Sequence, residues 1–381
     1  LVSDADYLTA SMASAIVLRS GLGSYSAVDL NKKLAGKAAA ANAAIGPTSE
    51  LLSGSASPKD LETLLQLANL RFTAPRLDTA AWLAMKAQLQ ASLANRGANP
   101  LQAYSDTLTA TMTQNNFRSK PPTLEMVNEI DPNKALAFYK DRFANAGEFT
   151  FVIVGNVKLD SLKPLVEKYL ASLPGTGRVE TFKDVGGAPP TGVVDKVVHK
   201  GSEPQAQTAI IFTGPFAYTP QKRLEMSALT TLAQMWLLDA LREEMGGTYS
   251  PSLGGGGAKV PRPEYQIVVQ YTSSPDNVDK LSARTFRVID SLKKTGPSAA
   301  DLTKVREQII RAHETSVKTN AYWLSNIAAR DQYGEDLAGL LTPYDDMVKN
   351  LTAKQIQDAA VLYFNTNRYI KVVLLPEPKV P

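Results

Sequence analysis

Few side chains in this sequence can bind a metal ion or act as a nucleophile. Among its 381 residues there is no cysteine, and the only histidines are His199 and His313. Without cysteine there are no disulfides, iron–sulfur clusters or thiolate zinc sites. Neither histidine has a second imidazole within helical or hairpin reach, so we expect both to be surface or packing residues, and we predict no metal ligands and no catalytic residues in this chain.

Arg242 and Tyr249 form the most distinctive pair of hydrogen-bond donors. They lie seven residues apart, at the end of a predicted helix and the start of a predicted strand, and Gly246 and Gly247 between them permit a tight reversal. Two donors that point into one space can hold a substrate carbonyl or stabilise a developing oxyanion. A structural role is the alternative, because a helix C-terminus favours arginine and strands favour tyrosine.

Other motifs give weaker signals. The run Gly254 to Gly257 is no phosphate loop, since no Lys-Ser/Thr follows it, and it predicts a hairpin tip or bulge, with a mobile flap near substrate as the alternative. Glu243 and Glu244 are adjacent, so they do not share a helix face. The sequence has no Gly-x-Ser-x-Gly elbow, which argues against a serine hydrolase.

Composition predicts a soluble globular protein of about two domains. Hydrophobic residues make up 44% and charged residues 20% of the chain, and no apolar run is long enough to span a membrane. The net charge of +4 comes without basic blocks, so we expect no nucleic-acid partner and no membrane partner. No targeting signal is visible near the N-terminus, and the compartment stays unknown, with the periplasm as a guess.

Hydrophobic periodicity indicates mixed helices and strands in two similar blocks. The Pro/Gly-rich stretch 174–192 is the predicted linker between a first αβ domain, 1–173, and a second, 193–381. The predicted strands are 37–45, 49–56, 149–154, 193–200, 207–213, 248–253, 265–272 and 369–375, and the predicted helices are 4–19, 27–34, 58–73, 78–94, 100–115, 133–143, 159–172, 221–244, 278–294, 299–319, 321–332, 344–350 and 354–363.

The two blocks repeat each other in sequence. Pro58 corresponds to Pro275 and Met126 to Met347, with offsets of 275 − 58 = 217 and 347 − 126 = 221. Two anchors with nearly the same offset indicate a duplicated domain. The second copy has two strands before its long helix and the first has none. We therefore expect that the first domain lacks its opening strands, exposes an apolar sheet edge or face, and is part of a longer polypeptide.

The order of elements and the segment Leu241 to Ser250 resemble the C-terminal half of a pitrilysin/insulinase-family zinc metallopeptidase. Arg242 to Ser250 follows that family's Arg-Glu-x-x-Gly-x-x-Tyr-Ser signature, and Gln207 to Gly214 and Trp323-Leu324 give supporting matches. The resemblance implies an α+β fold of two tandem homologous αβ domains, each an antiparallel sheet with helices on one side. It also implies that Arg242 and Tyr249 contact substrate.

The family's catalytic residues are absent from the matching positions. Its His-x-x-Glu-His helix binds zinc and carries the general base, but Met12, Ala15 and Ile16 stand at those positions here. The resemblance therefore implies the non-catalytic half of a zinc metalloendopeptidase, inactive alone, which encloses peptide substrate with an N-terminal catalytic half or zinc-bearing subunit as its partner. The alternative is a catalytically silent structural or assembly subunit.

Overall fold

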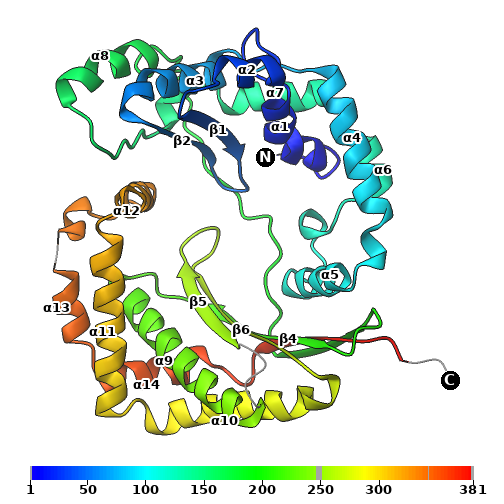
Figure 1. Cartoon of the computed structure of the whole chain (residues 1–381), viewed down its shortest axis with the longest axis vertical. Coiled ribbons are helices and arrows are strands. Elements are labelled where there is room, and N and C mark those ends of the chain that lie inside the picture. Colours follow the sequence, from blue (N-terminus) through cyan, green and yellow to red (C-terminus); the bar gives the residue numbers. More distant parts are fainter. Residues whose placement is uncertain (1, 246–250, 342, 379–381) are drawn as a thin grey trace. The chain divides into compact units, whose positions relative to one another are not determined.

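The chain forms two compact units, which the computed structural model describes over residues 2–245, 251–341 and 343–378, with the backbone alone for 242–245. Unit 1 contains Leu1–Asn95, Pro121–Asp184 and Trp323–Asp331, and unit 2 contains Arg96–Lys120, Val185–Tyr322 and Gln332–Pro381. Figure 1 shows the elements of each. In these ranges no helix is long and apolar enough to cross a membrane. A division into compact units does not show where a duplicated domain begins and ends. The domain limits 1–173 and 193–381 therefore stay a prediction.

Unit 1 packs helices around a short antiparallel hairpin. Its strands pair from Ala39 with Ala56 to Ile45 with Glu50. In α1, Ala13, Ile16 and Val17 follow a helical i, i+3, i+4 spacing and enter the core, where Phe72 and Phe143 meet edge to face at 5.3 Å. The elements are α1 (Tyr7–Arg19), α2 (Ala27–Lys33), β1 (Ala39–Ile45), β2 (Glu50–Ala56), α3 (Leu61–Thr73), α4 (Thr79–Ala94), α6 (Leu124–Asn128), α7 (Pro132–Arg142), α8 (Leu159–Tyr169) and the middle of α12 (Asn320–Tyr333).

Unit 2 is built on a larger sheet, whose described strands run in the order β3-β7-β4-β6-β5. All neighbours are antiparallel except β3 and β7, which are parallel. The elements are α5 (Pro100–Met112), β3 (Val193–His199), β4 (Ala206–Pro215), α9 (Pro220–Met245), β5 (Ser252–Ala258), β6 (Glu264–Ser273), α10 (Val278–Thr295), α11 (Ala299–Ser316), α13 (Tyr344–Lys349), α14 (Ala353–Tyr363) and β7 (Tyr369–Leu375).

Helices cover the two faces of this sheet unequally. Ile210 and Phe212 of β4 point into the large core that α9, α10, α11 and α14 complete. Ala209 and Ile211 point to the other face, where Tyr104 of α5 packs on them. The α+β class is thus confirmed, with a mixed second sheet and a helix from the first half of the chain on its second face.

Two details of the predicted strands are wrong. Residues 150–154 belong to no strand, because a strand needs a backbone partner and the described sheet of unit 1 contains β1 and β2 alone. Phe149 instead packs against Phe72 with ring centroids 4.9 Å apart. The glycines 254–257 are not a hairpin tip, since they lie inside β5 and pair with β6. That unit 1 lacks two opening strands stays a prediction.

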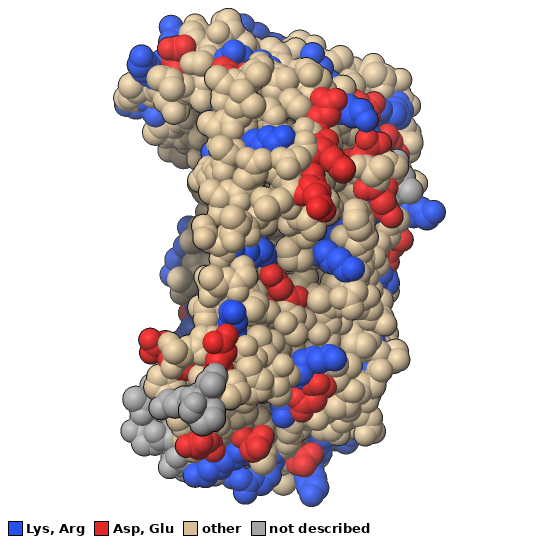
Figure 2. Space-filling view, turned by 90° about the vertical axis from the view of Figure 1, so that its right-hand side faces the viewer, with Lys and Arg blue, Asp and Glu red and all other residues tan. Residues whose placement is uncertain are grey.

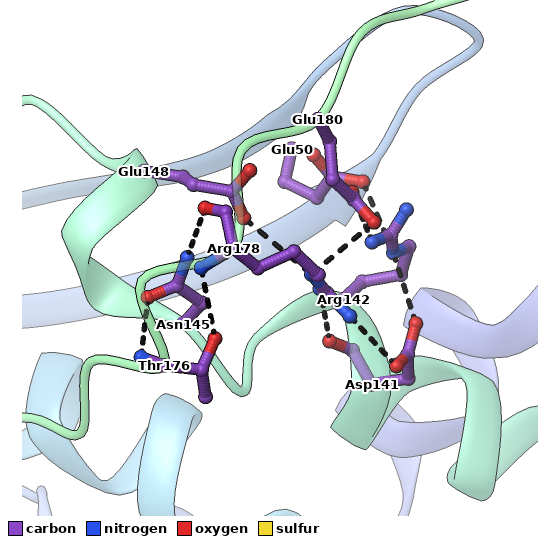
Figure 3. Close-up of polar contacts among 8 residues, drawn as sticks. All are labelled: Glu50, Asp141, Arg142, Asn145, Glu148, Thr176, Arg178 and Glu180. Carbon is purple, nitrogen blue, oxygen red and sulfur yellow. Dashed lines mark hydrogen bonds and ion pairs between the residues drawn. The ribbon is translucent and has the colours of Figure 1, made fainter.

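The predicted linker is attached to a unit at each end. Asn145 accepts a hydrogen bond from Thr176 N and donates one to Arg178 O, both at 2.8 Å, and Arg178 forms ion pairs with Asp141 and Glu180 (Figure 3). In unit 2, side chains bond the carbonyls of later linker residues: Gln114 that of Ala188, Asn116 that of Val185 and Arg262 that of Gly187. These contacts leave only a short stretch near 181–184 between the two attachments.

Candidate functional site

The α1 positions that match the family's zinc helix lie in a hydrophobic environment. Ile16 is 1% exposed in the core of unit 1, and Met12 and Ala15 pack against that core. Across the described ranges, no cluster of three or more His, Cys, Asp or Glu side chains could hold a metal ion. The residues at these positions therefore do not fit a catalytic zinc, since thioether and alkyl side chains offer neither imidazole nor carboxylate ligands.

The two histidines have neighbours that explain them without a metal. His199 Nδ1 lies 3.2 Å from the carbonyl of Pro376 at the end of the sheet. His313 on α11 lies 3.3 Å from Asp345 Oδ1 and 3.2 Å from the Tyr322 hydroxyl, and its ring packs on Tyr344. The cluster joins α11 to α12, which carries Tyr322, and to α13, which carries Tyr344 and Asp345, so His313 has a packing role.

Of the predicted donor pair Arg242 and Tyr249, the structure describes only a part. The backbone of Arg242 lies in the last turn of α9, whereas its side chain and the whole of Tyr249 lie outside the described residues. Their substrate-contacting role therefore stays a prediction. The nearest described elements are α9, which contains the backbone of Arg242, and β5, which begins at Ser252 after Tyr249.

A groove of about 740 Å³ lies along β5 and β6, on the sheet face away from α9. Its floor is one face of the hairpin, where Ser252, Gly254 and Gly256 stand opposite Gln270, Val268 and Gln266. This volume falls in the usual range for ligand pockets, roughly 300–1,000 Å³. Pro189 of the linker and Thr213 of β4 also line it.

The groove has polar walls whose charges are compensated. Arg262 Nε lies 3.4 Å from Glu264 Oε1, and Arg262 Nη2 donates to the carbonyl of Gly187 at 3.0 Å. Tyr265 at the groove's edge donates to Tyr363 O at 2.9 Å, and burial raises its pKa to about 12, so it stays a neutral donor at physiological pH. Charged side chains are likewise mixed in sign over the face that Figure 2 shows.

Sequence reasoning missed this groove. Gln266, Val268 and Gln270 alternate with the buried Tyr265, Ile267 and Val269, and that alternation is the signal for a strand with one open face. The sequence could not show that Gly254 and Gly256 would lie opposite Val268 and Gln266, because the pairing register is a property of the folded sheet.

A family model and several known proteins are similar to this chain in sequence. Residues 129–309 match the family model described as the peptidase M16 inactive domain. The chain is 26% identical over 344 residues to a "Zinc protease PQQL-like" of Arabidopsis thaliana, covering 84% of this chain and 36% of that protein. It thus spans only about a third of the length of that relative.

Solved structures show the same architecture. The periplasmic protease PqqL from Escherichia coli superposes with a TM-score of 0.84 at 21% identity, over 99% of this chain and 41% of that one. A peptidase M16 inactive domain from Pseudomonas fluorescens gives a TM-score of 0.76 at 16% identity, over 97% of this chain and 88% of that one.

These matches confirm the predicted resemblance to the pitrilysin/insulinase family of zinc peptidases, with residues 129–309 similar to its inactive domain. More particularly, the chain's sequence relatives include PqqL and PqqL-like zinc proteases.

Proposed function

We propose that this chain is the non-catalytic half of a zinc metalloendopeptidase and helps to enclose and bind a peptide substrate. The observation that carries the proposal is the match to an inactive M16 domain, together with Met12, Ala15 and Ile16 in a hydrophobic environment at the ligand positions. Zinc and the general base belong to a catalytic partner half, either in the same polypeptide or in a separate subunit. Because PqqL of Escherichia coli is a periplasmic protease, we extend the periplasmic location to this chain within the same proposal.

Arg242 and Tyr249 are the proposed substrate-binding residues. A guanidinium and a phenol hydroxyl both donate hydrogen bonds, so they can hold a substrate carbonyl and stabilise the oxyanion that develops during hydrolysis. A protein that only supports an assembly needs neither donor at the substrate. This difference separates the proposal from the alternative of a silent structural or assembly subunit.

The test is turnover by the complete enzyme with Arg242→Ala and Tyr249→Phe. Loss of one oxyanion-type donor typically lowers turnover by about 10² to 10³. We expect a loss of that order in each variant, with unchanged melting behaviour and unchanged zinc content. Arg284→Ala on α10 is a control for the loss of an arginine elsewhere in unit 2.

Unchanged turnover in both variants, with the control also unchanged, would make Arg242 and Tyr249 packing residues. The structural-subunit alternative would then be the better account.

A further inference from the structure

The four consecutive glycines of β5 fall into two classes. A Cβ at Gly257 would lie 2.0 Å from the ring of Phe216, and one at Gly255 would lie 2.5 Å from the carbonyl oxygen of Gln266. Both contacts are closer than atoms can approach, so the packing of the core side requires glycine at these two positions.

For Gly254 and Gly256, the described part of the chain gives no such packing reason. A Cβ at either position would meet no described atom within 4 Å, and neither residue has a positive φ. Glycine weakens a strand because it loses more backbone entropy and packs no side chain. In a strand, such a glycine often marks a place where another backbone or a ligand approaches closely.

Both unexplained glycines face the groove. By the strand register, Gly254 lies opposite Val268 and Gly256 lies opposite Gln266. Because residues 254 and 256 have no side chains, the backbone of β5 itself forms this part of the groove floor. The space above the two glycines is thus part of the groove itself.

Two amide side chains stand along the groove on β6. Gln266 and Gln270 are four residues apart on one face, roughly 13 Å along the strand. Neither side chain makes a hydrogen bond to any residue that the structure describes. Each amide offers a donor and an acceptor, which is the pattern that a peptide backbone presents in return.

We propose that this groove binds an extended, uncharged polypeptide segment over Gly254 and Gly256, with Gln266 and Gln270 bonded to its backbone. The inference rests on the proposed function, for which it names a substrate subsite. The compensated charges of Arg262 and Glu264 suit an uncharged occupant rather than a phosphate or an acidic ligand. Along the chain, β5 of the groove also comes directly after the segment that carries the proposed Arg242/Tyr249 pair.

The test measures binding of an unfolded polypeptide by the full chain. The probe is fluorescein-labelled α-lactalbumin whose cysteines are reduced and carbamidomethylated, which blocks them without adding charge, and the readout is fluorescence anisotropy. Gly254→Val and Gly256→Val fill the floor, so we expect each to weaken binding about tenfold or more, with a melting temperature equal to or above that of the wild type. Gln266→Ala and Gln270→Ala each remove one amide, for which we expect about a fivefold loss.

Gly97→Val is the matched control, since Gly97 also has open space at its Cβ and no positive φ but does not line the groove. We expect it to bind the probe like the wild type. Equal binding by the wild type and all groove variants would overturn the groove as a subsite while leaving the proposed function intact. No binding by the wild type would contradict both. A dimer in sedimentation that Gly254→Val abolishes would identify a second copy as the occupant and overturn the inference.

Discussion

Asp60 joins two elements of unit 1 through a single carboxylate. Its Oδ2 atom accepts hydrogen bonds from the Ser57 hydroxyl at 2.7 Å and from the backbone N–H of Ala38 at 3.0 Å. The Ser57 hydroxyl, followed by the Ala38 N–H, holds the pKa of Asp60 below its ordinary value. The ionised carboxylate thus fixes the start of β1 against the turn before α3.

The lowered pKa predicts how stability depends on pH. Because the folded chain holds Asp60 ionised more strongly than the unfolded chain does, its contribution is complete above the unfolded pKa, about 3.9. It is lost as the pH falls through the lower folded value. We expect Asp60→Asn to lower the urea midpoint at pH 7 and the deficit to shrink below about pH 4.

The matched control is Glu167→Gln on the exposed side of α8, which we expect to change the midpoint little at either pH. A deficit for Asp60→Asn that is the same at pH 7 and pH 2.5 would show that charge at Asp60 does not stabilise the fold.

At the scale of single residues, residue type alone decides some questions and leaves others open. Met12, Ala15 and Ile16 offer zinc neither imidazole nor carboxylate, and that statement follows from the sequence without the fold. The different roles of Gly254 and Gly255 could not be predicted, because they depend on whether Phe216, Ile267 or open space lies above each Cα.

At the scale of elements, long periodic helices were predictable and isolated strands were not. The predicted helix 278–294 appears as α10, Val278–Thr295, since its apolar spacing alone fixes the buried face. The apolar segment 149–154 has the composition of a strand but finds no partner in the described chain, whereas β7 lies between β3 and β4. Pairing is a long-range property that a local pattern does not contain.

The attachment of the linker to unit 1 depends on one buried amide. Asn145 is 1% exposed, and its side chain bonds both the Thr176 N–H and the Arg178 carbonyl. Asn145→Ala would leave these backbone groups without those bonds, which typically costs about 1–3 kcal/mol. We expect a loss of unfolding free energy in that range and faster cleavage of residues 174–180 in limited proteolysis.

The matched control is Asn133→Ala, because Asn133 is exposed and its side chain makes no hydrogen bond to the described residues. Cleavage of 174–180 at the same rate in Asn145→Ala and in the wild type would mean that the arginine ion pairs hold this segment without Asn145.

At the scale of the whole molecule, both units repeat one order of elements. In each, a helix comes before a hairpin, a short 3₁₀ turn and a second helix: α1, β1, β2 and α3 in unit 1, and α9, β5, β6 and α10 in unit 2. Unit 1 has the additional helix α2 between α1 and its hairpin. This shared order is consistent with the predicted duplication, whose alignment sets Met12, Ala15 and Ile16 of α1 against the family's zinc helix. The predicted donor pair and the groove both belong to unit 2, whose described sheet is larger than that of unit 1.

The most direct test of the account is to measure zinc content and peptide hydrolysis for this chain alone. We expect no stoichiometric zinc and no cleavage of an unfolded protein substrate by the isolated chain, with cleavage appearing only when a half that carries His-x-x-Glu-His is added. One zinc ion per chain that is lost on changing His199 or His313, together with hydrolysis by the chain alone, would contradict it.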